Sequence, residues 1–584
     1  MPTLIEEPAT APRIIERFAG VAPYSAERPI QPIDLWLDMN EACAPDPSAL
    51  AAIGAINPDA LRRYPDASAL ERAFAERIGI DAARVLATAG ADDAIERVCR
   101  VSLDDSRTLV THTPGFSMIE RSARCSGAKV ANIEWAEGEF PVQRFLEAID
   151  DRTGVVALVS PNNPTGLVVD RSVVERAARR CAEVGAALLL DLAYVEFAAD
   201  DPTAFALTLP NTVIARTLSK AYGLAGLRVG FLAGDAHIIA ASRAVGGPFA
   251  ISSPSIAAAA AVLTADDSVL AERRERIARE RDALTGLLRS RGASVADSHA
   301  NFALARFDRS CRARWVRDAL RGLGVAVRAW PDASPLACSL RITCPGNDPQ
   351  FARLTDALKT TLAPEAILLD LDGVLADVSR SYRAAIIATC ESFGVRVTPA
   401  DVAAIKRRGQ ANNDWIVTRD LLAQSGLDIE LREVIERFEA IYQGTPSRPG
   451  LRETESLIGS LETVRRLASR VPLAIVTGRP RADAERFFDR FGLAASVSAT
   501  VCMEDGPSKP DPTVVRLALE RLGVKRAWMV GDTVDDVRAA RAAGIVPLGI
   551  IAPNDDRDAT TDALLRAGAA RVLSTLDNLS EILP

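Results

Sequence analysis

Apolar segments of strand length alternate with amphipathic helical stretches along most of this chain. Between about residues 80 and 240, the alternating segments include 155–159, 172–184 and 187–190. After a helical stretch at 348–362 and the spacer 363–365, the alternation starts again with the apolar run 366–369. This pattern predicts strand–helix–strand units and mostly parallel sheets. We therefore expect an α/β protein whose fold restarts near residue 364.

The length of the chain supports the same division. A chain of 584 residues is too long for one hydrophobic core, and 48% apolar with 25% charged residues is typical of globular proteins. The spacer at 363–365 is too short to act as a flexible tether. We expect two domains, 1–362 and 366–584, that pack against each other.

Charge and apolar patterning exclude several classes of partner. The net charge is −8 and no long basic run occurs, which argues against nucleic acid and anionic membranes as partners. The most apolar stretch, 250–265, is interrupted by serines and a proline, so it does not predict a membrane span. The N-terminus lacks the pattern of a signal peptide, and the nine cysteines include no Cys-x-x-Cys pair. We expect a cytoplasmic protein, and the charge still allows small acidic or phosphorylated ligands.

Lysine is rare in this chain, and two lysines lie in runs with catalytic character. Only six of the 69 basic residues are lysines. Arginine can replace lysine as a solvated cation, but it cannot form an imine or shuttle a proton near neutral pH. Lys220 and Lys509 are therefore candidate catalytic residues.

The run around Lys220 combines groups that bind phosphate with an amine that can react with an aldehyde. Thr217 and Ser219 precede Lys220, and Arg228 follows it. Together they suggest pyridoxal phosphate (PLP), held by its phosphate and joined to Lys220 as a Schiff base. Asp191, at the end of an apolar run, can keep the pyridine nitrogen protonated.

These residues belong to a longer ordered set. In chain order the set is Tyr24, Asn40, Glu41, Arg63 to Asp66, Gly90 to Asp92, Phe116, Pro161 to Gly166, Asp191, Tyr194, Lys220 to Arg228, Arg328 and Arg341. By this set, about residues 10–362 resemble the fold-type I aminotransferases, and among them the histidinol-phosphate aminotransferases. The resemblance implies the PLP-dependent transferase fold, in which a large mixed-sheet domain is followed by a small domain.

The resemblance also implies roles for individual residues. Lys220 would be the Schiff-base lysine and proton shuttle, Asp191 the partner of the ring nitrogen, and Phe116 the side chain stacked on the ring. The remaining cofactor contacts would be Asn163 and Tyr194 at the ring hydroxyl, with Ala91, Asp92, Thr217, Ser219 and Arg228 at the phosphate. Substrate would be bound by Tyr24, Arg328 and Arg341, and Tyr64 would reach the site from a second subunit, which implies a homodimer.

Three positions depart from the family pattern. Ala42 follows Asn40-Glu41 where the family continues with Asn-Pro, Ile119 stands where a tyrosine is common, and Leu192 replaces a usual glutamate. These changes leave the cofactor residues intact. They put recognition of an imidazole substrate in doubt.

A second set of polar residues follows the strand-like run 366–369. Asp370 and Asp372 lie two residues apart, so both side chains point the same way, and one could attack phosphorus while the other handles the proton of the leaving group. Thr477, Lys509 and Asp532 follow further along the chain, each in a short run. A nucleophile, an acid and a cation suit the very slow hydrolysis of phosphate monoesters.

Residues 366–584 resemble the haloacid-dehalogenase-type (HAD) phosphatases, which have a Rossmann-like fold with a helical cap. The resemblance makes Asp370 the nucleophile and Asp372 the general acid/base. The remaining roles are phosphoryl binding by Thr477 and Lys509, and Mg²⁺ ligation by Asp370, Asp532 and the backbone carbonyl of Asp372, with Asp536 in support. The cap would span about 377–461, and its basic segment 406–415 is either a solvated loop or a substrate contact.

The preferred interpretation is a bifunctional enzyme of amino-acid biosynthesis. Its aminotransferase would convert a phosphorylated ketone to an amine with glutamate as donor, and its phosphatase would hydrolyse the product, as in consecutive steps of histidine biosynthesis. One alternative keeps both chemistries but acts on another phosphorylated amino compound, or decarboxylates a phosphorylated amino acid. In a further alternative, one domain serves only as a regulatory or binding module.

Overall fold

The computed structural model describes residues 15, 18, 28–41, 44–409 and 412–583. Contacts within the chain divide it into two compact units. The first contains Leu37–Phe307 and Trp330–Phe351, and the second contains Arg28–Trp36, Asp308–Ala329 and Ala352–Pro584. The second unit therefore includes a segment of one helix and one strand, 308–329, that lies well before the spacer at 363–365. The expected domain limits near residue 364 remain a prediction.

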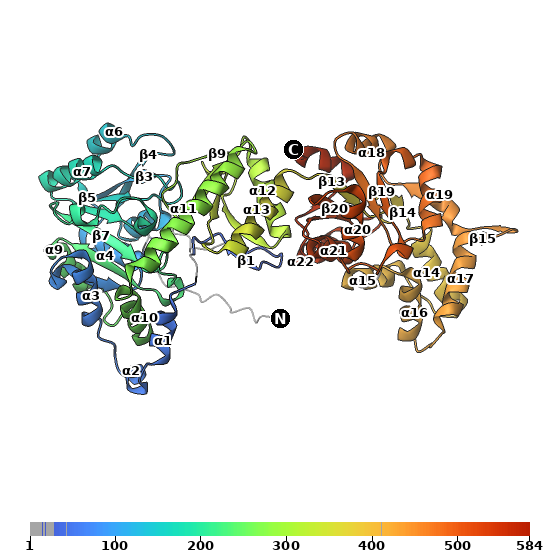
Figure 1. The fold of residues 1–584 in the computed structure, drawn as a ribbon, viewed down its shortest axis with the longest axis horizontal. Coiled ribbons are helices and arrows are strands. Elements are labelled where there is room, and N and C mark those ends of the chain that lie inside the picture. Colours follow the sequence, from blue (N-terminus) through green and yellow to red (C-terminus); the bar gives the residue numbers. More distant parts are fainter. Residues whose placement is uncertain (1–14, 16–17, 19–27, 42–43, 410–411, 584) are drawn as a thin grey trace. The chain divides into compact units, whose positions relative to one another are not determined.

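The first unit is built on a seven-stranded sheet with the strand order β2-β8-β7-β6-β5-β3-β4 (Figure 1). Its strands are β2 (Val85–Thr88), β3 (Thr108–Thr113), β4 (Lys129–Glu134), β5 (Thr153–Val159), β6 (Ala187–Asp191), β7 (Thr212–Thr217) and β8 (Gly230–Gly234). The pairs among β3 to β7 are parallel, and only β8 runs antiparallel to its neighbours. This confirms the mixed, mostly parallel sheet that the alternating pattern predicts.

Two helices pack an apolar face against this sheet. α4 (Ala91–Ser102) and α5 (Ser117–Cys125) contribute Ile95, Val98 and Ile119 to a buried cluster with the strands. The other helices of the unit are α1 (Pro47–Gly54), α2 (Pro58–Arg62), α3 (Ser68–Ile78), α6 (Val142–Glu147), α7 (Arg171–Val184), α8 (Thr203–Ala206), α9 (Ala236–Val245), α10 (Ser253–Leu263) and α11 (Asp267–Arg289). A small antiparallel group comprises β9 (Ser294–Val295), β10 (Phe302–Arg306) and β12 (Ser339–Thr343).

The second unit contains a six-stranded, entirely parallel sheet with the order β19-β18-β13-β20-β21-β22. Its strands are β13 (Ala366–Leu369), β18 (Leu473–Val476), β19 (Ala499–Val501), β20 (Ala527–Gly531), β21 (Val546–Ile550) and β22 (Arg571–Leu573). Its helices are α18 (Leu461–Ala468), α19 (Arg481–Phe491), α20 (Thr513–Leu522), α21 (Val534–Ala542), α22 (Arg557–Ala567) and α23 (Leu579–Ile582). This is the Rossmann-like sheet expected for a HAD-type domain.

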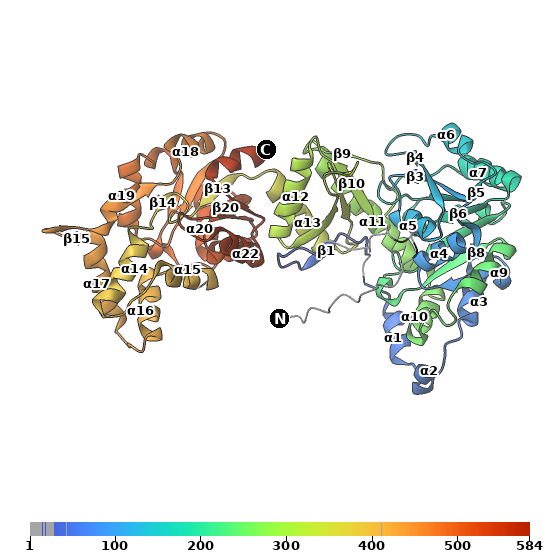
Figure 2. The ribbon, with the colours of Figure 1, turned by 180° about the vertical axis from the view of Figure 1, so that it is seen from behind.

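A helical cap is inserted after the first strand of this sheet. The cap helices are α14 (Tyr382–Ser392), α15 (Pro399–Arg408), α16 (Asp414–Gln424) and α17 (Leu431–Gln443), followed by the short pair β15 (Gly444–Thr445) and β16 (Arg448–Pro449). The chain enters the cap through β14 (Ala376–Asp377) and returns through β17 (Ser456–Leu457), which pair antiparallel. Figure 2 shows α14, α16 and α17 grouped to one side of the sheet.

The second unit also includes α12 (Ser310–Gly322), β11 (Val325–Ala329), part of β1 (Leu35–Leu37) and most of α13 (Asp348–Leu362). Trp315 of α12 packs edge to face against Trp528 of β20, with 4.7 Å between ring centroids, and both indoles are fully buried. Trp528 donates its Nε1–H to the carbonyl of Thr360, 2.9 Å away. Arg571 forms an ion pair with Asp318 at 2.6 Å. These helices therefore share a core with the parallel sheet.

Two sequence expectations concern membranes and disulfides. In the described part of the chain, no single helix has the length and apolar character to cross a membrane, although α10 and α11, bent by 86°, pass that test as a pair. All eight cysteines within the described residues are unpaired.

Candidate active sites

The first candidate site lies where three neighbouring parallel strands end. Asp191 is the last residue of β6, Asn163 lies in the turn after β5, and Lys220 follows β7 by three residues. Carboxyl ends of adjacent parallel strands meet at one edge of a sheet, which is where α/β proteins bind their ligands. The strand order thus explains how residues 57 positions apart in sequence come to share a site.

Lys220 is half-buried, and the pKa of its amine is lowered. Its Nζ donates to the carbonyl oxygen of Met39 at 2.9 Å and lies 5.9 Å from the ring centroid of Tyr194. Burial, together with the nearby positive charge of Arg341, lowers the pKa of Lys220 to about 8. A neutral amine is the form that attacks an aldehyde, so this environment suits covalent attachment of a cofactor.

Asp191 and Tyr194 are buried. Asp191 accepts a hydrogen bond from the backbone N–H of Ala193 at 3.1 Å, and burial raises its pKa to about 7. A cationic ring nitrogen beside this carboxylate would oppose that shift. Burial raises the pKa of Tyr194 to about 12, so its phenol stays protonated, and its oxygen accepts a hydrogen bond from Asn40 Nδ2 at 2.9 Å.

The residues expected to bind phosphate form a cradle at the N-terminus of α4. Gly90 is the N-cap of this helix, with φ of 85°, and a Cβ at this position would lie 2.6 Å from Nη2 of Arg228. Arg228 donates to Asp92 Oδ2 at 3.0 Å and to Ser219 Oγ at 3.4 Å. Ser219 Oγ in turn accepts from Thr217 Oγ1 at 2.9 Å. Free amides at a helix start, two hydroxyls and a guanidinium are a suitable set for a phosphate group.

Arg341 lies on β12 and joins this site. Its Nη1 donates to Asn163 Oδ1 at 2.5 Å and its Nη2 to the carbonyl of Asp38 at 2.6 Å. Its guanidinium also lies 5.4 Å from the ring centroid of Phe302. Phe116, the expected stacking residue, is the half-buried N-cap residue of α5 and packs against the core of the sheet.

Three predicted residues are not brought into this group. Tyr64 is 82% exposed and stacks on Phe249, itself 56% exposed, with ring centroids 4.6 Å apart. Arg328 is half-buried on β11, in the second compact unit. Tyr24 lies outside the described residues. The roles of these three residues stay predictions.

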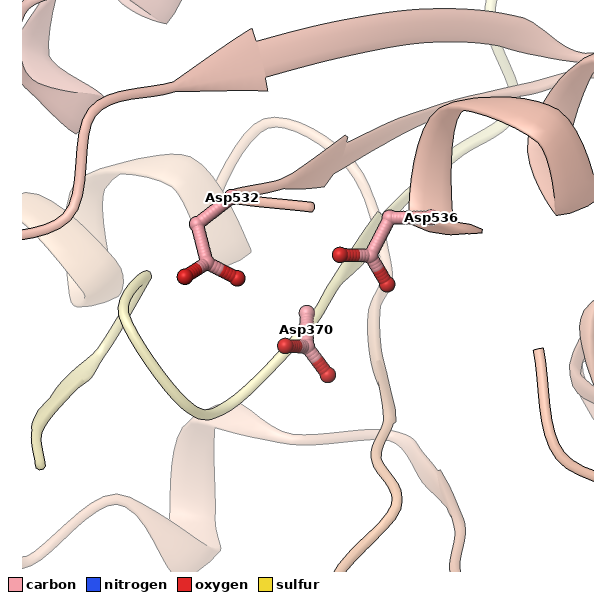
Figure 3. A group of neighbouring side chains, drawn as sticks. All are labelled: Asp370, Asp532 and Asp536. Carbon is pink, nitrogen blue, oxygen red and sulfur yellow. The ribbon is translucent and has the colours of Figure 1, made fainter. Parts of the chain in front are cut away.

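The second candidate site lies at the carboxyl ends of β18, β13 and β20, which are adjacent in the six-stranded sheet. Asp370 follows β13 and Asp532 follows β20, while Asp536 lies on α21. One oxygen from each of these three carboxylates lies within 4.8 Å of the other two. Figure 3 shows the three side chains pointing toward one another. Burial raises the pKa of Asp370 to about 7 and that of Asp532 well above its usual value, with repulsion between the acids adding to the effect.

Lys509 balances part of this negative charge. Its Nζ lies 2.8 Å from Asp370 Oδ1, contacts Asp536, and donates to the carbonyl of Val476 at 3.0 Å. Burial alone would lower the pKa of Lys509, but Asp370 and Asp536 raise it above its usual value. Thr477, directly after β18, is also buried, and its hydroxyl accepts from the N–H of Arg479 at 3.2 Å.

The side chain of Asp372 has different contacts from those of the other acids of the site. Its carboxylate is not part of the group of three and instead contacts Arg479, with Asp372 Oδ1 and Arg479 Nε 2.5 Å apart. Asp536, which the sequence suggested only as a supporting residue, takes a place in that group. Sequence reasoning did not single out Arg479, although it directly follows the Thr-Gly pair after β18.

The basic segment 406–415 of the cap reaches this site. Asn412 donates to Asp535 Oδ2 at 3.0 Å and to the carbonyl of Lys509 at 3.1 Å. Lys406 is mostly buried and lies 3.2 Å from Asp414. Residues 410–411 lie outside the described part. The segment therefore contacts the core, and its contact with substrate stays a prediction.

The chain is similar to known proteins in both halves. Residues 33–358, more than half of the chain, match the family model "Aminotransferase class I and II", and residues 364–544 match "haloacid dehalogenase-like hydrolase". A histidinol-phosphate aminotransferase from Dinoroseobacter shibae is 34% identical over 326 residues, which are 55% of this chain and 89% of the relative. A crystal structure of the Sinorhizobium meliloti histidinol-phosphate aminotransferase in complex with pyridoxal-5'-phosphate is 26% identical, with a TM-score of 0.54, and covers 60% of this chain and 97% of that one.

A third relative carries a different name. An imidazoleglycerol-phosphate dehydratase from Phytophthora nicotianae is 45% identical over 198 residues, which are 32% of this chain and 44% of that protein. The chain thus spans less than half the length of this relative. The two family matches, in contrast, coincide with the two sites assembled above. The chain belongs to the class I and II aminotransferases, and it is an enzyme in which such an aminotransferase is fused to a haloacid dehalogenase-like hydrolase domain.

Proposed function

We propose that the first site uses PLP to exchange an amino group between glutamate and a phosphorylated ketone, and that the second hydrolyses the phosphate ester of the resulting amine with Mg²⁺. The observation that carries this proposal is that each site brings reactive groups together within a single compact unit: Lys220, Asp191 and Arg341 in the first, and Asp370, Lys509 and Asp532 in the second. The names of the aminotransferase relatives favour histidinol phosphate as the amine.

The residues of the first site suit PLP. Lys220 would hold the cofactor covalently through its amine, and the cradle formed by Gly90, Ser219 and Arg228 would bind its phosphate. When bound, PLP supplies an electron sink for the carbon whose amino group is exchanged. Asp191, buried at the end of β6, would keep the ring nitrogen of the cofactor protonated. The amine of Lys220 would move a proton to and from the reacting carbon of the substrate.

Arg341 is the proposed anchor for the substrate. Its guanidinium faces Asn163, and a planar fork of donors binds carboxylates in a bidentate way. It would therefore hold the carboxylate of glutamate in one half-reaction. Arg328 is the proposed contact for the other anionic group of the substrates.

In the second site, Asp370 is the proposed nucleophile. An oxygen of Asp370 forms a bond to phosphorus while the bond between phosphorus and the ester oxygen breaks, and a proton passes from Asp372 to that ester oxygen. Water then attacks the phosphorus of the phosphorylated Asp370 and gives its proton to Asp372, which regenerates both carboxyl groups and releases phosphate. Lys509 and Thr477 hold the phosphoryl oxygens during both steps.

The acidic group of three fits a hard divalent cation. Oxygen ligands are those that Mg²⁺ prefers, and the carboxylates of Asp370, Asp532 and Asp536 converge closely. Burial, followed by repulsion between the neighbouring acids, raises the pKa values of Asp370 and Asp532, and a cation bound between them would stabilise their charged forms. Mg²⁺ would supply that compensation and would attract the phosphate. We propose Asp370, Asp532 and the carbonyl of Asp372 as its ligands, with Asp536 in support.

We further propose that the enzyme is a homodimer. Tyr64 and Phe249 are large, exposed and stacked on each other, and they line a cavity of about 540 Å³ together with Arg97 and Arg243. A second copy would cover these rings, and Tyr64 would then reach the partner's cofactor phosphate.

The experiment that tests the function uses the full chain and a panel of substrates. Specificity constants for phosphate release are compared among histidinol phosphate, other amine phosphates, sugar phosphates and phosphoglycolate, with and without Mg²⁺. Amino transfer is followed with the same amine phosphates and 2-oxoglutarate as acceptor. We expect one amine phosphate to be preferred in both assays. A phosphatase that prefers sugar phosphates or phosphoglycolate would show that the two reactions are not consecutive.

A further inference from the structure

The guanidinium of Arg479 lies between two carboxylates and is almost completely enclosed. Its Nε is 2.5 Å from Asp372 Oδ1 and its Nη1 is 3.0 Å from Glu455 Oε2, while only 1% of the Arg479 side chain is exposed. The guanidinium carbon also lies 4.9 Å from the ring centroid of Tyr382 and 5.4 Å from that of Phe487. Arg479 is thus held by two ion pairs and two ring contacts, and one of its partners is the proposed general acid/base.

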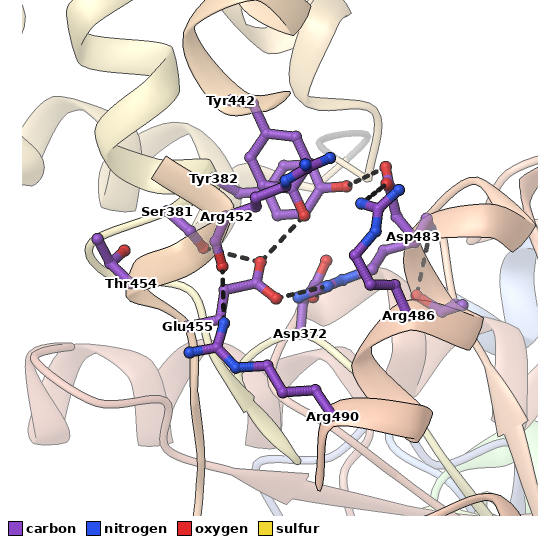
Figure 4. A network of polar contacts seen from close by, with 12 residues as sticks. Asp372, Ser381, Tyr382, Tyr442, Arg452, Thr454, Glu455, Asp483, Arg486 and Arg490 are labelled. Atoms are coloured by element: carbon purple, nitrogen blue, oxygen red, sulfur yellow. Dashed lines mark hydrogen bonds and ion pairs between the residues drawn. The ribbon is translucent and has the colours of Figure 1, made fainter. Parts of the chain in front are cut away.

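Glu455 connects this arginine to the cap. Its Oε1 accepts hydrogen bonds from Ser381 Oγ at 3.0 Å and from Tyr442 Oη at 3.1 Å, and its Oε2 accepts from Arg479 (Figure 4). Glu455 directly precedes β17, the strand by which the chain returns from the cap, and Ser381 follows β14, by which the chain enters it. The network therefore joins Asp372 to the two points where cap and core connect.

Arg479 contacts Asp372, although its own hydrogen-bonding capacity is not fully used. Nη2 of Arg479 is buried and has no hydrogen-bond partner within the described residues, which is costly for a charged donor. Asp372 is 25% exposed, so water alone could solvate its carboxylate. A buried arginine is thus used to hold a carboxylate that does not need it for solvation.

We propose that Arg479 is a positioning residue for Asp372, kept in place by Glu455 at the base of the cap. Arg479 contacts Oδ1 of Asp372, which leaves Oδ2 to exchange a proton with the ester oxygen of the substrate. The inference rests on the proposed phosphomonoester hydrolysis. It assigns to Arg479 the orientation of the acid, and no contact with phosphate or metal.

The test compares two esters that differ in their need for an acid. p-Nitrophenol leaves readily as an anion, whereas the alcohol of 2-aminoethyl phosphate leaves only with a proton. General acid catalysis contributes at least about 100-fold, so Arg479→Met should lower kcat/KM for 2-aminoethyl phosphate by about that factor and kcat/KM for p-nitrophenyl phosphate by less than about 5-fold. The comparison uses kcat/KM because it reports the step that releases the alcohol, whereas the later attack of water is common to both esters. Asp372→Asn should give the same split, and Arg479→Lys should recover part of the loss.

Glu455→Gln serves as a second variant that keeps Arg479 and removes one charge from its surroundings. We expect this variant to lower kcat/KM for 2-aminoethyl phosphate by about 10-fold and to affect p-nitrophenyl phosphate less. Equal losses on both esters, in Arg479→Met or, if that variant does not fold, in Glu455→Gln, would overturn the assignment. A wild-type chain that releases phosphate from neither ester nor histidinol phosphate in the presence of Mg²⁺ would instead refute the proposed hydrolysis itself.

Discussion

The pKa of Lys220 predicts how the cofactor-free enzyme takes up PLP at different pH values. With a pKa of about 8, roughly a tenth of the Lys220 amine is neutral at about pH 7 and half of it at about pH 8. Because the neutral amine attacks the aldehyde, the rate of covalent uptake should rise about 5-fold over this interval and less than about 2-fold from about pH 8 to 9. An amine with an ordinary pKa would gain about tenfold with each unit throughout.

The positive charge of Arg341 is one cause of the low pKa, after burial of the amine. Arg341→Gln should therefore raise the pKa of Lys220, slow the uptake at about pH 7 to 8, and make the rise between about pH 8 and 9 steeper. Arg341→Lys is the matched control, because it keeps the charge and should behave like the wild type.

The assay is stopped-flow absorbance after cofactor-free protein is mixed with PLP, and it does not depend on turnover. A tenfold increase per pH unit in the wild type would refute the low pKa of Lys220. Faster uptake by Arg341→Gln than by Arg341→Lys at about pH 7 would refute the electrostatic role of Arg341.

Four further outcomes are expected. Lys220→Ala should abolish amino transfer and the adduct that borohydride traps, and trapping at any other lysine, detected by peptide mapping, would contradict the assignment. Asp370→Asn should stop phosphate release and leave amino transfer nearly unchanged, because the two sites lie in separate compact units; hydrolysis of p-nitrophenyl phosphate at the parent rate would count against Asp370 as nucleophile. Trp528→Ala should lower the unfolding free energy of the second unit by about 3–5 kcal/mol, since it removes a buried indole and its hydrogen bond to Thr360; denaturation curves equal to those of the wild type would be inconsistent with that packing. Burial raises the pKa of Asp191 to about 7, so ionisation of this carboxyl group opposes folding. As pH rises from about 4 to 7, the free energy of unfolding of the cofactor-free wild type should fall by roughly 2–4 kcal/mol relative to that of Asp191→Asn. A difference in denaturant midpoint between the two proteins that stays constant with pH would exclude this linkage.

Much of the first site could be predicted from the sequence because its chemistry depends on single residues in fixed order. Lys220, Asp191, Asn163 and Arg341 do come together in the structure. Arg328 and Tyr64 could not be placed in the same way. The position of Arg328 depends on how the two compact units are arranged, and the proposed role of Tyr64 depends on a second copy of the chain.

The second site shows where sequence patterns reach their limit. Asp370 and Asp532 were predicted from short runs after strands, and adjacent parallel strands place them together. Asp370 and Asp372 were expected to point the same way, but the Asp372 side chain contacts Arg479 and is not in the acidic group of three. That contact, and the bond from Arg479 to Glu455, joins residues far apart in sequence through the cap. No local pattern in a single sequence reports such a long-range ion pair.

The packing of Trp315 against Trp528 makes the hydrolase domain depend on a helix that precedes it in the chain. A gene encoding only the residues from Ala363 onward would produce a sheet with a bare indole where α12 now lies, and its partner fragment would carry the complementary apolar helix. Both fragments would tend to aggregate or to find each other again in solution. The hydrolase domain therefore cannot be moved to another protein by itself. The transferred segment would have to include α12 and α13, or the face of β20 that they cover would have to be redesigned.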